Sequence, residues 1–355
     1  MGRKIKKRVS LIQFRLLVFT SVFLLISSFS FAGECYTYKD TLVYRPYKDT
    51  ARLVKAQVYT LNSSESILFY KPRPFEFITN IPSDFVLFGK NTFAKKNLPK
   101  LGLLIGATAV LVAFDQHTLD AAQQFGRYIH LDPQRKFKTA VSFDIGGFTI
   151  PVLDLPHNLN STFYFLGEGW PSILVAGSFY GYGIFTDNYR ARQTSSQLAE
   201  MFFSLAITCQ AMKRITGRQS PFQATLPGGK WRPFTNLATY QNDVSNYDAF
   251  PSGHMTTLMA TVTIIAGNYP SNKYIKPVGY TIMGLVGYAM LNNGVHWIGD
   301  YPVAIAIGYA LGKIAVNRGQ KIIHKNSLSV NRYKSSLTPV YLGSNNLGLC
   351  YKLKF

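Results

Sequence analysis

Acidic residues are scarce in this chain of 355 residues. Asp and Glu total 17 against 38 Lys and Arg, which gives a formal net charge of +21. This balance favours partners that carry negative charge, such as phosphorylated substrates, anionic lipid headgroups or nucleic acid. The sequence contains no basic helix repeat and no aromatic RNA-binding signature, so we expect no nucleic-acid partner.

Cysteine is also rare, and the spacing of Cys35, Cys209 and Cys350 fits no metal-binding pattern. A disulfide between Cys35 and Cys350 is compatible with an oxidising compartment. Three unpaired packing residues are the simpler interpretation, and both interpretations stay open at this point.

The N-terminus has the features of an export signal. Basic residues precede an apolar run from Leu16 to Phe31, and the run ends with small residues at the spacing of a cleavage site. We therefore expect a signal peptide at residues 1–32, cleaved before Gly33. An uncleaved membrane anchor is the alternative, and either interpretation puts the rest of the chain outside the cytoplasm, in the periplasm.

Six apolar segments predict helices. They cover residues 101–114, 163–185, 196–213, 254–269, 274–291 and 301–316. The last of them starts with Pro302 in its first turn, where proline is tolerated. Ala304, Gly308 and Gly312 lie four residues apart, so one face of that helix is small enough for close packing. The predicted fold class is all-α, a helical bundle with a six-helix core over residues 99–325.

The segments around this bundle carry weaker patterns. Residues 33–98 are polar, aromatic and rich in lysine, and we expect an irregular N-terminal extension with short helices there. Residues 116–160 are expected to combine a short helix with loops. The tail at 326–355 alternates apolar and polar residues from Leu347 onward, a period of two that is typical of a half-buried strand. We predict a C-terminal β-hairpin.

The apolar segments do not read clearly as membrane spans. A spanning helix needs about 20 mostly apolar residues, and several of these segments are shorter. The orientation implied by an exported N-terminus also conflicts with the distribution of lysine and arginine at the two ends of the bundle. We expect an exported protein that is soluble or peripheral; an integral inner-membrane protein with its site facing the periplasm is the alternative.

Two motifs carry the residue types of an anion site. Pro251-Ser-Gly-His254 opens a predicted helix, and helix N-termini favour anions while glycine allows close approach to the backbone. His296 follows the next helix, and Asp300 lies four residues later. Both histidines can exchange protons near neutral pH. Asp300 can accept a hydrogen bond from His296, and it can also cap the helix that follows.

The order of the helices predicts where these residues meet. If neighbouring helices are antiparallel, the C-terminal end of the segment that finishes at Lys213 lies beside both histidine motifs. Lys213 and Arg218 then add positive charge to the same end of the bundle.

The sequence resembles the type 2 phosphatidic acid phosphatase and vanadium haloperoxidase superfamily over roughly residues 100 to 320. That family has three motifs: Lys-x6-Arg-Pro, Pro-Ser-Gly-His and Ser-Arg-x5-His-x3-Asp. The corresponding segments here are 213–221, 251–254 and 289–300. The resemblance implies a helical phosphatase domain of the same kind.

Two positions depart from the family pattern. Ser220 and Met290 stand where the family has arginines that bind phosphate oxygens, and a charged hydrogen bond of this kind is worth about 1.5–3 kcal/mol. We expect Arg218 to point into the pocket as a substitute. Asn292 or Asn293 is expected to donate a hydrogen bond near Met290.

The resemblance implies a mechanism and its residues. His296 attacks phosphorus and forms a phosphohistidine, Asp300 orients His296, and His254 protonates the leaving oxygen and then activates water. Phosphate binding falls to Lys213, Arg218, Ser252 and Gly253, with no metal and no cofactor.

The function implied in this way is hydrolysis of phosphomonoester or pyrophosphate groups. We expect a phosphorylated lipid or a small phosphoester as the substrate, and a membrane surface as a partner. The alternatives are a degenerate, weakly active or inactive member that binds phosphate groups, motivated by the two missing arginines, and a vanadium haloperoxidase.

Overall fold

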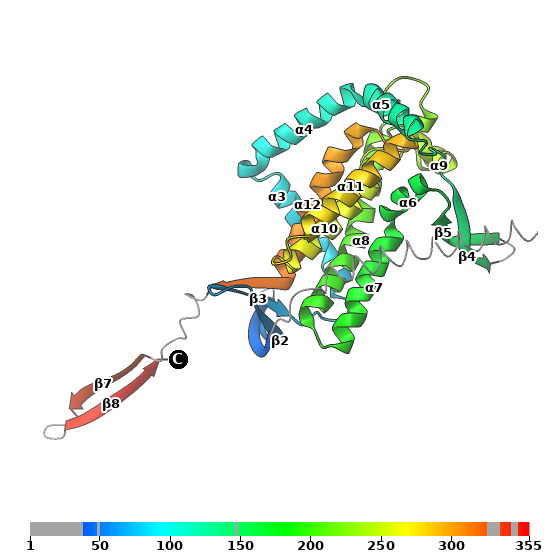
Figure 1. The fold of residues 1–355 in the computed structure, drawn as a ribbon. Coiled ribbons are helices and arrows are strands. Elements are labelled where there is room, and N and C mark those ends of the chain that lie inside the picture. Colours follow the sequence, from blue (N-terminus) through cyan, green and yellow to red (C-terminus); the bar gives the residue numbers. More distant parts are fainter. Residues whose placement is uncertain (1–37, 48–49, 146–147, 325–333, 342–346, 355) are drawn as a thin grey trace, which may run out of the picture. The chain divides into compact units, whose positions relative to one another are not determined.

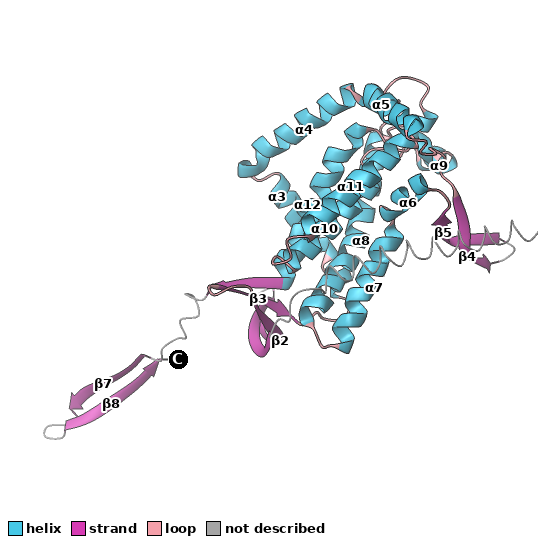
Figure 2. Ribbon diagram, in the orientation of Figure 1, coloured by secondary structure: helices cyan, strands magenta, loops and turns pink. Residues whose placement is uncertain are grey.

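The computed structural model describes residues 38–47, 50–145, 148–324, 334–341 and 347–354. The predicted signal peptide and Cys35 lie outside these ranges. The chain divides into two compact units. The described part of the first, from Tyr70 to Gln320, contains the helices, and we call it the helical unit; the second combines residues 36–69 with residues 321–355 (Figure 1, Figure 2).

The helical unit is built mainly from long helices. They are α2 (Glu76–Thr79), α3 (Ile81–Thr92), α4 (Leu98–Ala113), α5 (Asp115–Tyr128), α6 (Leu159–Leu166), α7 (Gly169–Phe185), α8 (Tyr189–Thr216), α9 (Leu237–Asn242), α10 (Gly253–Asn268), α11 (Ile275–Asn292) and α12 (Tyr301–Gly319). Short 3-10 turns are η1 (Lys95–Asn97), η2 (Pro221–Gln223), η3 (Val244–Asn246) and η4 (Ile298–Asp300). The prediction of an all-α class is confirmed for this unit.

Each of the six predicted segments falls on helix, with one break. The segment predicted at 163–185 is two helices, because α6 ends at Leu166 and α7 begins at Gly169. A Cβ atom on Gly167 would lie 2.7 Å from Cδ2 of His254. The chain therefore leaves the helix where it packs directly against a predicted site residue.

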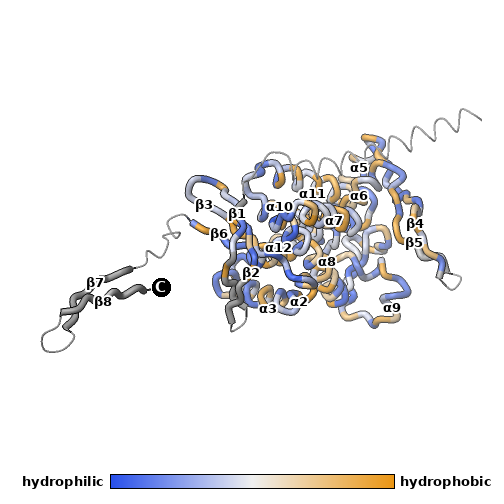
Figure 3. The backbone as a smooth tube through the Cα atoms, turned by 90° about the horizontal axis from the view of Figure 1, so that it is seen from below, coloured by the Kyte–Doolittle hydropathy of each residue, from blue (hydrophilic) through white to orange (hydrophobic). Residues whose placement is uncertain are grey.

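Helix α10 lies at the centre of the packing, in contact with α7, α8, α11 and α12. The small face of α12 is turned toward it: a Cβ on Gly308 would meet the carbonyl oxygen of Thr256 at 2.3 Å, and one on Gly312 would meet Thr263 at 3.2 Å. The close packing predicted from the four-residue spacing is thus an α10–α12 contact. Hydrophobic residues also recur along α7 and α11 (Figure 3).

The second unit corrects the prediction for residues 33–98. Strands β1 (Tyr38–Tyr47), β2 (Thr50–Thr60), β3 (Glu65–Tyr70) and β6 (Gln320–His324) form one sheet in the order β1-β2-β3-β6. Irregular structure was the wrong expectation for residues 38–70. The turn signal at Asn62 marks a hairpin, since its side chain accepts hydrogen bonds from the amides of Ser64 and Glu65.

Two further hairpins complete the strands. In the helical unit, β4 (Phe137–Ile145) pairs antiparallel with β5 (Phe148–Pro156), where loops were expected. Near the C-terminus, β7 (Lys334–Tyr341) pairs antiparallel with β8 (Leu347–Lys354), which confirms the predicted terminal hairpin. Cys209 is buried and forms no disulfide with any described residue.

Candidate active site

The structure brings the two motif histidines together at one end of the bundle. His254 is the second residue of α10, and His296 lies between α11 and η4. Their ring centroids are 6.3 Å apart and the rings are nearly perpendicular. Two imidazoles from segments that are distant in sequence therefore face the same space, as the helix order predicted.

Asp300 fixes one ring nitrogen of His296. Its Oδ2 atom lies 3.3 Å from Nδ1 of His296 and accepts a hydrogen bond of 2.8 Å from the amide of Trp297. The carboxylate thus orients the imidazole and also closes the turn before α12. With Nδ1 held by Asp300, Nε2 is the His296 nitrogen that can react with a substrate.

Arg218 does not point into a pocket, so the expectation that it replaces a phosphate-binding arginine is wrong. Its side chain is fully buried, donates to Asp300 at 2.6 Å and forms a second ion pair with Asp115. The guanidinium carbon of Arg218 lies 4.6 Å from the centre of the Trp231 ring and 5.4 Å from that of Trp297. Arg218 therefore acts on the site through Asp300.

The turn at the end of α8 explains why Arg218 is inward. Gly217 has a φ of 57°, and a Cβ on it would collide with the carbonyl oxygen of Arg232 at 1.8 Å. This left-handed residue reverses the chain directly after the helix, and the next side chain enters the core.

Asp115 is a site-supporting residue that sequence reasoning missed. It begins α5, pairs with Arg218, and accepts a hydrogen bond of 2.8 Å from the amide of Gly299. Burial raises the pKa of Asp115, and the neighbouring guanidinium of Arg218 opposes that rise. An acidic residue directly after an apolar helix was the available signal, but it is equally typical of a helix start.

The surroundings of His254 favour its neutral form. Burial lowers its pKa well below the usual value, and positive charge from His296, Lys213 and Arg135 lowers it further. Its Nε2 atom is buried with no hydrogen-bond partner among the described residues, and the ring of Tyr164 lies 4.3 Å away. A bound anion would favour the protonated form and ready the ring to act as an acid.

Lys213 and the start of α10 supply the anion-binding features. The Lys213 ammonium lies 3.5 Å from Oδ2 of Asp248. Ser252 caps α10 by accepting a hydrogen bond from the amide of Met255. A Cβ on Gly253 would meet no atom within 4 Å, so open space lies in front of the first turn, whose amides have no carbonyl of their own helix to bond.

The comparison with protein-family models returns one match, the PAP2 superfamily, over residues 194–323. Residues 194–323 belong to the PAP2 superfamily. No curated protein and no solved structure matches the chain. Members of this superfamily are phosphatases, and membership supports a phosphatase-type activity for the chain at that level.

The PAP2 region is completed by residues that lie before it in sequence. The matched segment contains Lys213, His254 and His296, whereas Asp115 and Tyr164 precede it. The geometry around the histidines therefore depends on α5 and α6 as well as on the recognised region.

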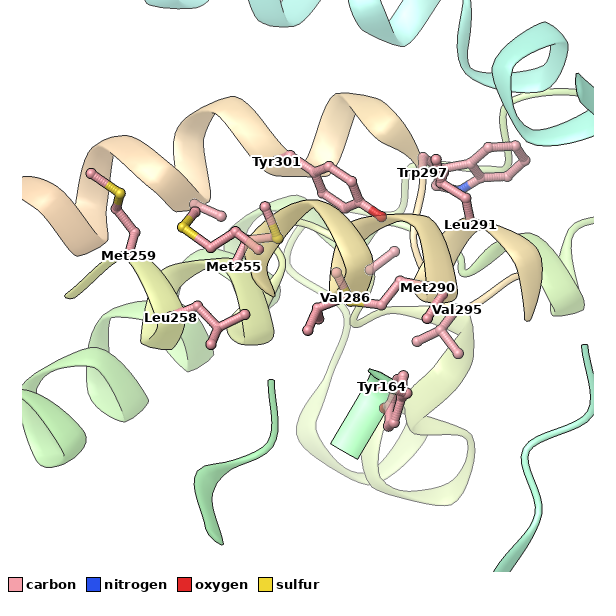
Figure 4. Close-up of a cluster of buried hydrophobic side chains, with 14 of the residues drawn as sticks. Tyr164, Met255, Leu258, Met259, Val286, Met290, Leu291, Val295, Trp297 and Tyr301 are labelled. Carbon is pink, nitrogen blue, oxygen red and sulfur yellow. The ribbon is translucent and has the colours of Figure 1, made fainter. Parts of the chain in front are cut away.

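The structure shows the surroundings of Met290 and Ser220, the two positions at which the family pattern has arginines. Met290 is fully buried in a hydrophobic cluster with Val286 and Val295, and its sulfur lies 3.6 Å from the hydroxyl of Ser252 (Figure 4). Ser220 is buried beside η2. Neither position contributes positive charge.

The prediction that Asn292 donates a hydrogen bond to a ligand in place of the missing arginine is also wrong. Its amide donates to the carbonyl of Leu131 and, at 3.0 Å, to Oδ1 of Asn160, so it is occupied on the α6 side. Asn293 accepts a hydrogen bond from the amide of Val295, while its Nδ2 atom is buried without a partner among the described residues. Donation from Asn293 to a ligand stays a prediction.

Proposed function

We propose that this protein is a metal-independent phosphatase that removes phosphomonoester or pyrophosphate groups from phosphorylated lipids at a membrane outside the cytoplasm. The observation that carries the proposal is the pair of facing imidazoles, one tied through Nδ1 to a buried carboxylate and the other without a hydrogen-bond partner at Nε2 among the described residues.

The first half-reaction transfers the phosphoryl group to the protein. Nε2 of His296 forms a bond to phosphorus as the bond from phosphorus to the leaving oxygen breaks. His254, protonated once the anion is bound, gives its proton to that oxygen. Asp300 stabilises the positive charge that develops on His296.

The second half-reaction regenerates the enzyme. The now neutral His254 accepts a proton from water, whose oxygen attacks the phosphohistidine, and inorganic phosphate leaves as the phosphorus–nitrogen bond breaks. Lys213 and the first-turn amides of α10 stabilise the phosphoryl oxygens in both steps, because they are held in place before the charge develops.

The lipid part of the proposal rests on α4. No residue of this apolar helix is buried against the other residues that the structure describes, and Leu103 is 75% exposed. Among the described residues, one helical segment, Lys95–Ala113, is long and apolar enough to cross a bilayer. Lipid contact would cover this surface, and the lysines at its start would meet anionic headgroups.

The test is phosphate release by the full chain from phosphatidic acid and a prenyl pyrophosphate in mixed vesicles, and from a water-soluble phosphoester. We expect turnover, its inhibition by vanadate, and a higher kcat/KM on the vesicle substrates. His296→Gln and His254→Gln should each reduce turnover by at least a hundredfold, from the usual contribution of acid–base and nucleophilic groups of about 10² or more. Turnover that survives either change would contradict the mechanism.

The second candidate is a phosphate-binding protein with little turnover, favoured by the buried Met290 and the inward Arg218. It predicts vanadate binding by the wild-type chain without phosphate release from any of these substrates. Binding measured by calorimetry beside the turnover assay separates the two functions.

A further inference from the structure

We propose that Arg135, on the segment between α5 and β4, is a second phosphate-binding cation of this site. The inference rests on the proposed function, because it assigns a ligand contact within the same site. It concerns a residue that lies outside the recognised PAP2 region.

Lys213, the cation already proposed for this site, is only partly available for a ligand. Lys213 lies 3.5 Å from Asp248, and its side chain is 12% exposed. A phosphomonoester dianion brings about two negative charges at neutral pH, where its second proton has a pKa near 6. One lysine with a carboxylate neighbour leaves much of that charge without a balancing cation.

The other arginines near this end of the bundle contact groups other than the two histidines. Arg218 is enclosed between two carboxylates. The guanidinium of Arg214 lies 4.1 Å from the centre of the Tyr240 ring, and that of Arg232 lies 5.5 Å from the centre of the Tyr247 ring.

Arg135 lies beside the turn that follows α8. Its guanidinium lies 5.4 Å from the centre of the Phe222 ring, in the η2 turn that begins directly after Ser220. The residues on either side of Arg135 are tied to the start of α6: the carbonyl of Gln134 accepts a hydrogen bond from Asn158, and the amide of Lys136 donates one to Ser161 at 2.9 Å. Helix α6 also carries Tyr164, whose ring is 4.3 Å from that of His254. Arg135 thus lies beside the η2 turn, on a segment fixed to the helix that packs against the proposed acid–base histidine.

The electrostatics agree with this position. Burial and the charge of His296 lower the pKa of His254 most, and the charge of Arg135 contributes in the same direction. Burial and the nearby Asp154 raise the pKa of Glu168 to about 7, and Arg135 opposes that rise. Arg135 is exposed to solvent, so it can turn from these neighbours to a ligand at little cost in buried contacts.

The guanidinium geometry suits the role. Its planar donors can hold two phosphate oxygens at once, whereas a lysine ammonium acts as a point charge. Arg135→Lys should therefore recover only part of the binding that Arg135→Ala loses.

The neighbouring lysine provides a matched control. Lys136 has the same charge and is also exposed, but its ammonium is 2.7 Å from Asp132 and its exposed ion pair contributes little. Lys136→Ala removes one positive charge from the same segment without removing a group that faces the site.

The experiment measures orthovanadate affinity by calorimetry and KM on vesicle phosphatidic acid for the full chain and three variants. We expect Arg135→Ala to weaken vanadate binding and raise KM by about tenfold or more, as for loss of a charged hydrogen bond. Arg135→Lys should fall between it and the wild type, and Lys136→Ala should stay within about twofold of the wild type.

Two outcomes overturn the assignment. One is an active wild-type enzyme whose vanadate affinity and KM are unchanged in Arg135→Ala, which leaves the proposed function intact. The other is a wild-type chain that binds no vanadate and releases no phosphate, which removes the function and the assignment together. A purely structural role is excluded by a loss of vanadate affinity at unchanged thermal stability.

Discussion

Two buried clusters at opposite ends of α12 each place one arginine between two carboxylates. The cluster at the start of the helix, which we call the site cluster, is Asp115–Arg218–Asp300, and the one at its end, the distal cluster, is Asp84–Arg318–Glu200. Both connect segments that are distant in sequence. They differ in the donors that complete them and in how much water reaches the arginine.

The site cluster is closed on all sides. All three side chains are fully buried. Backbone amides complete the carboxylates, from Gly299 to Asp115 and from Trp297 to Asp300, each at 2.8 Å. Because these backbone donors are fixed by the turn itself, they hold each carboxylate in one position.

The distal cluster is more open. The Arg318 side chain is 18% exposed, and Glu200 receives its further hydrogen bond from the side chain of Asn80, at 2.7 Å. Burial, and then the charge of Asp84, raise the pKa of Glu200 to about 8. Burial raises the pKa of Asp84 as well. Two carboxylates around one arginine are thus held by backbone donors at one end of the helix, whereas at the other end burial raises the pKa of Glu200 into the physiological range.

The largest expected effect comes from removing each arginine. Arg218→Met leaves two buried carboxylates without their cation, which should cost about 3–5 kcal/mol of unfolding free energy and abolish turnover. Arg318→Met should cost less, because solvent reaches its cluster and a proton can replace part of the lost charge. Urea unfolding followed by circular dichroism measures both. A larger loss for Arg318→Met would refute the comparison.

The next effect is a dependence on pH in the distal cluster. The folded state raises the pKa of Glu200 from 4.5 to about 8, so this group's contribution to stability is complete below about pH 4.5 and is lost as the pH rises through about 8. The loss is at most about 1.4 kcal/mol per pH unit in that window. Glu200→Gln cannot ionise and should flatten this part of the stability profile. An unchanged slope in the variant would show that other groups cause it.

The sequence predicted the long helices and the meeting of the histidines well, for a physical reason. Apolar periodicity and chain order are local signals, and antiparallel packing converts them into a position. The four-residue spacing of small residues on α12 is also a local signal, and it correctly predicted close helix packing. The strands at 38–70 were missed because the same turn signals precede a hairpin and an irregular loop, and the partner strand β6 lies some 250 residues further along the chain.

Local sequence patterns could not predict whether a side chain points into the pocket or into the core. Arg218 was expected in the pocket because it is close in sequence to Ser220, but the left-handed Gly217 turns it into the core. Its partner Asp115 is 103 positions away, and no spacing rule connects them. Arg135 was overlooked because it belongs to no motif.

The smallest expected effect tests whether the site cluster orients the nucleophile through two intermediate groups. Asp115→Asn keeps an oxygen that can accept from the amide of Gly299, but it removes the negative charge of Asp115. Arg218 then has Asp300 as its one remaining carboxylate partner in the cluster. The ion pair between Arg218 and Asp300 becomes stronger, and Asp300 becomes a weaker hydrogen-bond acceptor for His296. We expect kcat to fall about tenfold, about 1.4 kcal/mol in activation free energy, with KM within twofold because Asp115 does not touch the substrate.

The control for this change lies on the same helix. Asp120 is exposed on α5 and accepts a hydrogen bond of 2.9 Å from Gln116, so Asp120→Asn removes a similar charge without affecting Arg218. A shifted imidazole limb in the pH profile of kcat/KM for Asp115→Asn, absent from Asp120→Asn, would show that the cluster acts on His296 rather than only on folding. If both variants keep the wild-type kcat and pH profile, the buried arginine stabilises the bundle alone, and the two clusters differ in solvent access but not in function.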